Sequence, residues 1–272
     1  MTAQSEPSRD PATRAFSIAL VAFRVKAGMS KKELAEKLGY TPAYISQVEA
    51  TKNMPSVKFA EDLNTLFGTE AFVDLWQNIM DARTNSLLPP GFAEYVEHEA
   101  RASLIYAFEF SVIKGIFQTH DYAREILRWG RAADEAEQLV CRRMERKDVI
   151  SRESPPQIVA VFDEVVIRRV FGSGEIMKTQ IDHLIEIAEM PNVLLQFVSA
   201  DKGAYPGING SFTLMEFDTG PAMVYVEGHA GGTLTEHAVT VREHRLSFNL
   251  IRAAAMSADE SLLLLREVRE RL

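Results

Sequence analysis

The sequence has almost no cysteine and no long apolar run. Cys141 is the single cysteine among 272 residues, so the chain cannot form an internal disulfide bond. The longest purely aliphatic run, Leu262–Leu265, is far shorter than the roughly 20 residues that cross a bilayer. The chain does not open with a basic segment, an apolar stretch and a cleavage site, the pattern of a secretory signal. These absences predict a cytoplasmic protein without a membrane partner.

The residue patterns of common catalytic and metal sites are missing as well. The six histidines include no pair four residues apart, and none lies near Cys141, so the spacing of a zinc site is absent. No glycine-rich phosphate loop follows a predicted strand, and no Gly-Xaa-Ser-Xaa-Gly motif occurs. We therefore expect no catalytic residue, no metal and no cofactor. An enzyme built on the C-terminal part is the least favoured of the alternative functions.

Charge is distributed unevenly along the chain. The net charge is −8, yet the segment from Arg14 to Lys58 holds eight basic and three acidic residues, a net +5. The rest of the chain therefore carries −13. A basic segment in an acidic chain attracts phosphate at one end, which favours a nucleic-acid partner for the N-terminal part.

A capping box predicts the first of two short helices in the basic segment. The Ser30 side chain can accept a hydrogen bond from the backbone of Glu33, whose carboxylate can reach back to Ser30. Gly39 is a typical helix end. Together these residues predict a helix over residues 31–38.

A second short helix follows after a tight turn. Thr41 is a good N-cap, and Pro42 suits the first helical position, where a missing N–H costs nothing. Ile45 and Val48 lie three residues apart and form one inward face, while the residues between them point elsewhere. A helix braced in this way can lie in the DNA major groove. A generic helical hairpin is the alternative.

The segment from Leu34 to Pro55 resembles the helix-turn-helix of Xre-type, phage-repressor-like regulators. This resemblance implies an all-α, five-helix domain over residues 13–84 that binds double-stranded DNA. Thr51 departs from the family, which usually has glycine there, so we expect a different or slightly strained helix exit. The shared residues are Leu34, Ala35, Leu38, Gly39, the run 41–49, Lys52 and Pro55.

Side chains on and around the second helix are the candidate DNA contacts. Gln47 can offer a paired donor and acceptor to adenine, and Ala43 can touch a thymine methyl group. The lysines suit the phosphate backbone. Each residue has the alternative of being merely solvated. The full set is Lys31, Lys32, Thr41, Ala43, Tyr44, Ser46, Gln47, Lys52 and Asn53.

A Pro-Pro-Gly sequence marks the boundary to a second domain. Pro89 to Gly91 break the helical pattern, which predicts a linker over residues 85–91 and a C-terminal domain over residues 92–272. The periodicity predicts an α/β or α+β fold with a helical first half and then a small mixed sheet. The predicted helices are 92–106, 120–131, 133–149, 163–170, 174–189, 234–254 and 258–272, and the predicted strands are 157–162, 193–198, 211–217 and 222–227.

The C-terminal part also resembles a known domain, an uncharacterised one attached to many actinobacterial Xre-type regulators that are described as antitoxin-like. The run over residues 114–117, Lys-Gly-Ile-Phe, departs from it, because the family tends to have Pro-Gly-Leu-Leu before Gln118. A pocket formed by that turn would have an altered shape. The resemblance rests on residues 97–100, Gln118, Thr119, Tyr122, Arg124, Arg143, Arg146, Asp163, Glu164, Arg168, Arg169, Ser211, Phe212 and 224–227.

Four of these residues are candidates for a ligand or partner contact: Gln118, Thr119, Tyr122 and Arg168. Helix capping explains the first two equally well. The pattern as a whole predicts a sequence-specific transcriptional regulator, expected to be a homodimer, whose C-terminal domain senses a ligand, binds a partner or dimerises. The alternative is an antitoxin that neutralises a small protein encoded next door and regulates its own synthesis.

Overall fold

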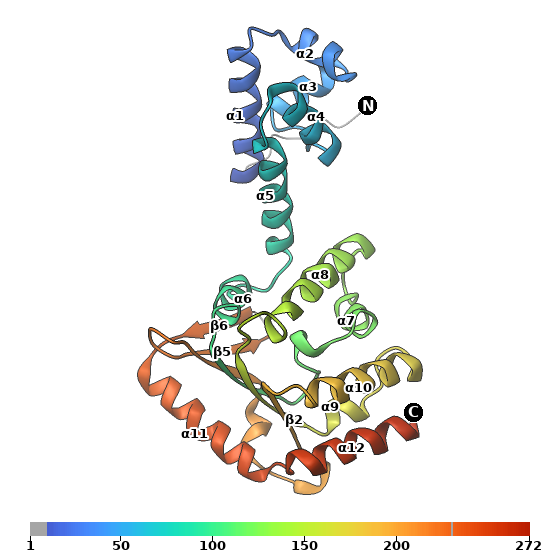
Figure 1. The fold of residues 1–272 in the computed structure, drawn as a ribbon, viewed down its shortest axis with the longest axis vertical. Coiled ribbons are helices and arrows are strands. Elements are labelled where there is room, and N and C mark those ends of the chain that lie inside the picture. The colour runs from blue at the N-terminus through green and yellow to red at the C-terminus, as the bar shows by residue number, and fades with distance from the viewer. Residues whose placement is uncertain (1–9, 230) are drawn as a thin grey trace. The chain divides into compact units, whose positions relative to one another are not determined.

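The computed structural model describes residues 10–229 and 231–272 (Figure 1). The chain divides into two compact units, one ending at Ser86 and the other beginning at Leu87. Within the described residues, no helix combines the length and the apolar character needed to cross a membrane.

The N-terminal unit is a five-helix domain, as predicted. Its core is built from Phe16, Leu20, Leu34, Ile45 and Phe59, together with apolar residues of the last helix. Helix α2 of the helix-turn-helix has the predicted bounds, and helix α3 begins at Pro42 as predicted. The helices are α1 (Pro11–Lys26), α2 (Lys31–Leu38), α3 (Pro42–Glu49), α4 (Val57–Phe67) and α5 (Ala71–Ser86).

Local signals explain these bounds. The predicted capping box is present at the start of α2, where Ser30 accepts from the Glu33 backbone and Glu33 accepts from the Ser30 backbone. Gly39 ends α2 in the left-handed conformation. Helix α5 ends at Ser86, two residues beyond the predicted end of the domain at residue 84, and the Thr84 hydroxyl donates to the Met80 carbonyl within it.

The exit from α3 has the strained backbone that its sequence predicts. Thr51 has a φ of 55°, and it is the one non-glycine residue with positive φ in the described part of the chain. This conformation turns the backbone so that the N–H groups of Lys52 and Asn53 both donate to the Gln47 carbonyl. The last turn of α3 is therefore closed by a β-branched residue in a conformation that favours glycine.

The C-terminal unit is organised around one mixed sheet of six strands in the order β3-β2-β1-β4-β5-β6. Strands β1, β2 and β3 are parallel, whereas β4, β5 and β6 continue the sheet antiparallel. The strands are β1 (Leu104–Glu109), β2 (Gln157–Asp163), β3 (Val193–Val198), β4 (Phe212–Glu216), β5 (Met223–Gly228) and β6 (Gly231–Thr235).

Helices cover both faces of the sheet (Figure 1). The larger core lies on the face that carries α10 and α12, and the opposite face packs Phe248 and Ile251 of α11 against Phe108 and Val161. The helices are α6 (Phe92–Glu99), α7 (His120–Leu127), α8 (Ala133–Glu145), α9 (Val165–Arg168), α10 (Gly174–Ala188), α11 (Ala238–Ala254) and α12 (Ala258–Arg271), with short 3-10 turns η1 (Gly115–Phe117), η2 (Arg146–Ile150), η3 (Ala200–Lys202) and η4 (Pro206–Asn209).

The predicted helix over residues 92–106 is wrong, because the chain changes from α6 to strand β1 within it. Ile105 and Ala107 lie in the larger core, whereas Tyr106 and Phe108 pack in the opposite core. This alternation has a period of two, which is that of a strand. The aromatic and aliphatic residues at spacings of three and four in this segment belong to two different elements.

The predicted helix over residues 234–254 is also wrong at its start, where edge strand β6 was missed. Helix α11 begins only at Ala238. Gly231 and Gly232 leave the first two positions of β6 without side chains, but the strand pairs with β5. A Cβ atom at Gly232 would lie 2.0 Å from the Tyr225 hydroxyl oxygen, so the absence of a side chain makes room for that ring.

Two predicted helices are shorter than expected. Helix α7 ends at Leu127 rather than near Arg131, with Gly130 in the left-handed conformation after it. Helix α8 ends at Glu145 and continues as the 3-10 turn η2 rather than as α-helix to residue 149.

The predicted linker over residues 85–91 contains the last two residues of α5 and the segment that leads into α6. Asn85 and Ser86 are helical, and Leu88 packs against the larger core of the C-terminal unit. The Pro90 carbonyl accepts a 2.8 Å hydrogen bond from Gly232. Gly91 has a φ of 79°, and a Cβ atom there would lie 2.4 Å from the Gly232 carbonyl oxygen. The Pro-Pro-Gly sequence is therefore fixed to β6.

Candidate DNA-binding surface and a polar cavity

Helix α3 is anchored to the N-terminal unit by one face. Ile45 and Val48 are fully buried, as their spacing predicted. The Ser17 hydroxyl of α1 donates to the Val48 carbonyl at 3.1 Å. The opposite side of α3 is exposed at Ala43 and Gln47. A helix held in this way presents its outward side chains as a rigid row.

A buried carboxylate joins three helices behind that row. Glu49, at the end of α3, accepts from Arg24 Nε of α1 at 2.6 Å and lies 3.2 Å from Lys31 Nζ of α2. Lys31 Nζ also lies 3.4 Å from the Ser46 hydroxyl. Lys31 is thus a structural partner of Glu49, and Ser46 a partner of Lys31, and both are also candidate DNA contacts.

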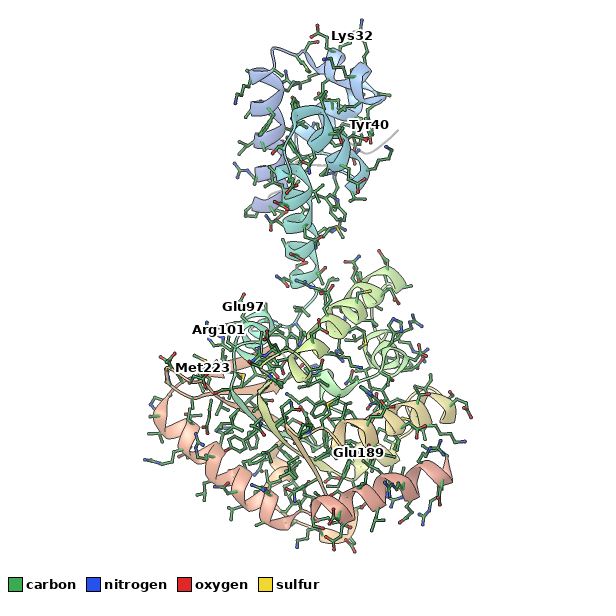
Figure 2. The ribbon with its side chains drawn as sticks, in the orientation of Figure 1. Lys32, Tyr40, Glu97, Arg101, Glu189 and Met223 are labelled. Carbon is green, nitrogen blue, oxygen red and sulfur yellow. The ribbon has the colours of Figure 1, made fainter. Side chains whose placement is uncertain are left out.

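The remaining predicted contacts lie on or beside α3. Thr41 caps α3 by accepting from the Tyr44 backbone at 3.1 Å, and its side chain is exposed. Lys32 is exposed on α2 (Figure 2). Lys52 is exposed and Asn53 half-buried in the turn after α3. All of these residues lie on α2 or in the turns directly before and after α3.

Tyr44 has a structural role that its sequence position did not reveal. Its ring stacks on Tyr40 with centroids 5.2 Å apart and meets Phe59 edge-on. Its hydroxyl accepts a 3.4 Å hydrogen bond from the Ser56 backbone. The hydroxyl of Tyr40 donates to Asp62, and burial with this hydrogen bond raises the Tyr40 pKa to about 12. The Tyr40–Tyr44 pair therefore packs α3 against α4.

The C-terminal unit contains a polar cavity of about 150 Å³. Phe92 and Tyr95 of α6, Arg143 of α8 and Arg146 of η2 line its helical side. Its other lining residues come from the sheet, from the segment after β1 and from α7: Glu109, Val112, Ile113, Lys114, Gly115, Gln118, Ile126, Ser211, Phe212, Thr213, Tyr225 and Glu227. The cavity includes Lys114, where the sequence departs from the family it resembles.

A fully partnered ion network forms one wall. Lys114 Nζ donates to the Tyr95 hydroxyl and to Thr213 Oγ1, each at 2.9 Å, and lies 3.5 Å from Glu99 Oε1. Arg146 NH2 donates to Glu99 Oε2 at 2.6 Å. The positive charges of Arg146 and Lys114 outweigh the effect of burial and lower the pKa of Glu99.

Arg143 is a cation without a carboxylate partner among the described residues. Its NH1 donates to the Gln118 side-chain oxygen at 2.7 Å, and no ion pair joins it to an acidic residue in the described chain. Burial, with the nearby charge of Arg146, lowers the Arg143 pKa to about 10. Gly115 lies between the two guanidinium groups, because a Cβ atom there would be 3.6 Å from Arg143 Nε and 3.7 Å from Arg146 NH1.

Two carboxylates lie on the sheet side of the cavity. Phe108 of β1 pairs with Phe212 of β4, which pairs with Val226 of β5. The next position along each strand places Glu109 and Glu227 on one face of the sheet, on either side of Ser211. Burial raises the Glu109 pKa to about 7, although Lys114 opposes part of that shift.

Family comparison identifies both units. Residues 92–267, more than half of the chain, match the family described as "Domain of unknown function (DUF5753)". The chain belongs to the DUF5753 family. Residues 20–72 match the helix-turn-helix family, which makes the N-terminal unit an Xre-like DNA-binding domain and supports a DNA-binding transcriptional regulator. Searches of curated proteins and of solved structures gave no match.

The four ligand candidates predicted from sequence are dispersed in the DUF5753 domain. Gln118 lines the cavity, where it bridges Arg143 and the Ile113 carbonyl and caps no helix. Arg168 lies outside it and pairs with Glu164.

Thr119 and Tyr122 also lie outside the cavity lining. Thr119 stands at the start of α7, but its hydroxyl makes no capping bond. Capping therefore explains neither Gln118 nor Thr119. Tyr122 is fully buried, and its hydroxyl accepts from the Ile113 backbone at 3.3 Å. Its place is in the core.

Sequence reasoning missed most of the charged cavity residues of the DUF5753 domain. Arg143, Arg146 and Glu227 belong to the segments that carried the family resemblance, but their spacing alone indicated no common site. Glu109 lies in a segment that the sequence assigned no role. The strand register that joins Glu109 to Glu227 across β4 depends on pairing between distant segments.

Proposed function

We propose that this DUF5753-family chain is a cytoplasmic, sequence-specific transcriptional regulator that binds duplex DNA as a homodimer. Helix α3 enters the major groove, Gln47 reads one base pair and Ala43 touches a thymine methyl group. Lys31, Lys32 and Lys52 contact the phosphate backbone. The dimer and the individual contacts are part of the proposal.

One observation carries this proposal. Helix α3 buries Ile45 and Val48 completely while Ala43 and Gln47, on its other side, are exposed. The braces from Ser17 and Arg24 hold α3 in one orientation. A rigid helix with short outward side chains fits a groove closely, and a Gln amide can pair with two atoms of adenine at once.

The test compares two substitutions on cognate and scrambled duplexes. Gln47→Ala is expected to cost about 1–3 kcal/mol on the cognate site and to relax preference at one base pair. Lys52→Ala is expected to weaken binding to all sequences alike and to reduce the salt dependence. Fluorescence anisotropy at fixed salt measures both.

Gln77→Ala provides the matched control, because Gln77 is an exposed glutamine on α5. This variant should bind both duplexes as the unaltered chain does. An equal loss on both duplexes for Gln47→Ala would refute its base-reading role.

We further propose that the DUF5753 domain controls when the N-terminal unit binds DNA, by taking up a ligand or a small protein encoded next door. A ligand shifts this equilibrium only through different affinities for two states, and a coupling of about 1–3 kcal/mol changes occupancy roughly 5- to 150-fold. Operator affinity of the full chain and of a fragment ending at Ser86 should respond differently to the neighbouring small protein. An equal response would place control in the N-terminal unit.

A further inference from the structure

We propose that the cavity of the DUF5753 domain is a binding site for a small, free α-amino acid with an aliphatic side chain. The carboxylate of the amino acid pairs with Arg143, and its ammonium group lies against Glu109 and Glu227. This inference goes beyond DNA binding and is tested without DNA.

Size limits the ligand first. The cavity measures about 150 Å³. A protein cavity of about this volume holds benzene, which has roughly as many non-hydrogen atoms as alanine or valine. A nucleotide or a folded partner is far too large for this space. The site therefore takes a single small metabolite.

The anionic end of the ligand follows from Arg143. Its guanidinium group lies at the cavity wall, and in the described chain its hydrogen-bond partner is the neutral Gln118 amide rather than a carboxylate. A guanidinium group has five N–H donors in a planar fork that matches a carboxylate. Arg146 is already paired with Glu99, so Arg143 is the cation with charge to offer.

The cationic end follows from the acidic residues of the sheet. Glu109 and Glu227 lie on the same face beside the cavity, and neither forms an ion pair with a described residue within 4 Å. A phosphate or a second carboxylate would be repelled there, whereas an ammonium group is attracted. The buried hydroxyl of Tyr225, which has no hydrogen-bond partner among the described residues, adds a further polar group to this lining.

The apolar part of the lining indicates the side chain. Val112, Ile113 and Ile126 contribute aliphatic surface, and Phe92 and Phe212 contribute aromatic rings. These surfaces favour a methyl or branched aliphatic group over a charged one. An amino acid such as alanine or valine has the carboxylate, the ammonium group and the small aliphatic side chain that this lining favours.

The experiment measures ligand binding to the full chain by calorimetry and thermal shift. The probes are valine, alanine, isovalerate, which lacks the ammonium group, isobutylamine, which lacks the carboxylate, and inorganic phosphate. We expect valine or alanine to bind, and isovalerate, isobutylamine and phosphate to bind about 10-fold or more weakly. The proposal is overturned when no probe amino acid binds at millimolar concentration, or when isovalerate or phosphate binds as tightly as valine.

Three substitutions locate the binding. Arg143→Gln is expected to weaken binding of the amino acid about 10- to 100-fold, and Glu227→Gln, at an exposed residue, about 10-fold. Arg142→Gln is the matched control, because Arg142 is the preceding residue on α8, lies outside the cavity lining and pairs with Glu145. Equal affinity in Arg142→Gln and in both cavity variants would place the bound amino acid elsewhere and overturn the site. Since Glu227 is exposed, its variant tests the site even where Arg143→Gln does not fold.

Discussion

Arg24 on α1 binds Glu49 at the end of α3 with two nitrogens, Nε at 2.6 Å from Oε1 and NH2 at 3.2 Å from Oε2. The Glu49 side chain is only 5% exposed, and Lys31 of α2 approaches the same carboxylate at 3.2 Å. Arg24 and Lys31 therefore share one buried carboxylate as their ion-pair partner. A buried charge therefore helps to set the orientation of the proposed recognition helix.

Glu49→Gln should destabilise the N-terminal unit by about 2–4 kcal/mol, because it leaves two partly buried cations without their carboxylate. The loss is measured as the free energy of unfolding in denaturant. Glu36→Gln is the control: Glu36 is exposed and lies 3.9 Å from Lys32, so it should cost less than about 0.5 kcal/mol. Equal costs for the two variants would contradict the bracing role of Glu49.

The fold of the N-terminal unit was predictable because its signals are local. The capping box of Ser30 and Glu33, the left-handed Gly39 and the Thr41 cap each act within a few residues. The sequence therefore predicted both ends of α2, the start of α3 and a different or slightly strained exit at Thr51. It did not predict that Tyr44 packs on Tyr40, because that contact depends on how α3 lies on its neighbours.

The C-terminal unit was harder to predict because its decisive contacts are distant in sequence. Strand β1 is recognisable only once Ile105 and Phe108 are assigned to opposite faces of a sheet, and β6 has two glycines and no strong pattern of its own. The cavity could not be predicted for the same reason, because its lining residues come from segments that are distant in sequence. Of the lining residues, the sequence predicted Gln118 as a ligand contact. Arg143 and Glu109 come to the same cavity only through the positions of α8 and β1 and through the strand register.

Thr51→Gly should stabilise the N-terminal unit by about 0.5–1 kcal/mol. A non-glycine residue in the left-handed region costs on the order of 1–3 kcal/mol, and the greater freedom of glycine in the unfolded chain offsets part of the gain. Thr51→Ala removes the branched side chain but not the Cβ atom, so its gain should be smaller. Unfolding in denaturant without DNA measures both variants, and a loss of stability in Thr51→Gly would show that Thr51 makes a favourable contact that outweighs its strain.

Glu109 should make the stability of the DUF5753 domain fall between about pH 4.5 and pH 7. Burial raises its pKa from 4.5 to about 7, with Glu227 and Glu99 adding to the shift and Lys114 opposing it. The folded state therefore keeps a proton that the unfolded chain releases, and stability falls as the pH rises through this range. Glu109→Gln removes the free-energy cost of ionising a buried carboxyl group. The variant should therefore be about 1–3 kcal/mol more stable than the unaltered chain at pH 8.

The measurement is the difference in the free energy of unfolding between Glu109→Gln and the unaltered chain at each pH. The contributions of the other titrating groups cancel in that difference. The difference should be small at pH 4 and should grow until about pH 7. A difference that does not change with pH would show that Glu109 has an ordinary pKa in the folded protein.

Glu99 should contribute more to the stability of the DUF5753 domain than either of the two cations that pair with it, Lys114 and Arg146. Its side chain is 2% exposed and is shared by Lys114 at 3.5 Å and Arg146 at 2.6 Å. Lys114→Met leaves Glu99 paired with Arg146, whereas Glu99→Gln leaves two buried cations side by side. We expect a cost of about 1–3 kcal/mol for Lys114→Met and about 3–5 kcal/mol for Glu99→Gln.

The double variant separates charge pairing from packing. In Lys114→Met combined with Glu99→Gln, one of the two unpaired cations is gone, so the total cost should be at least about 1 kcal/mol below the sum of the single costs. Denaturant unfolding followed by circular dichroism measures all three variants, and Glu49→Gln identifies the transition of the N-terminal unit by shifting it alone. If the two single costs simply add, the contribution of Lys114 to stability comes from its hydrogen bonds to Tyr95 and Thr213 and does not depend on Glu99.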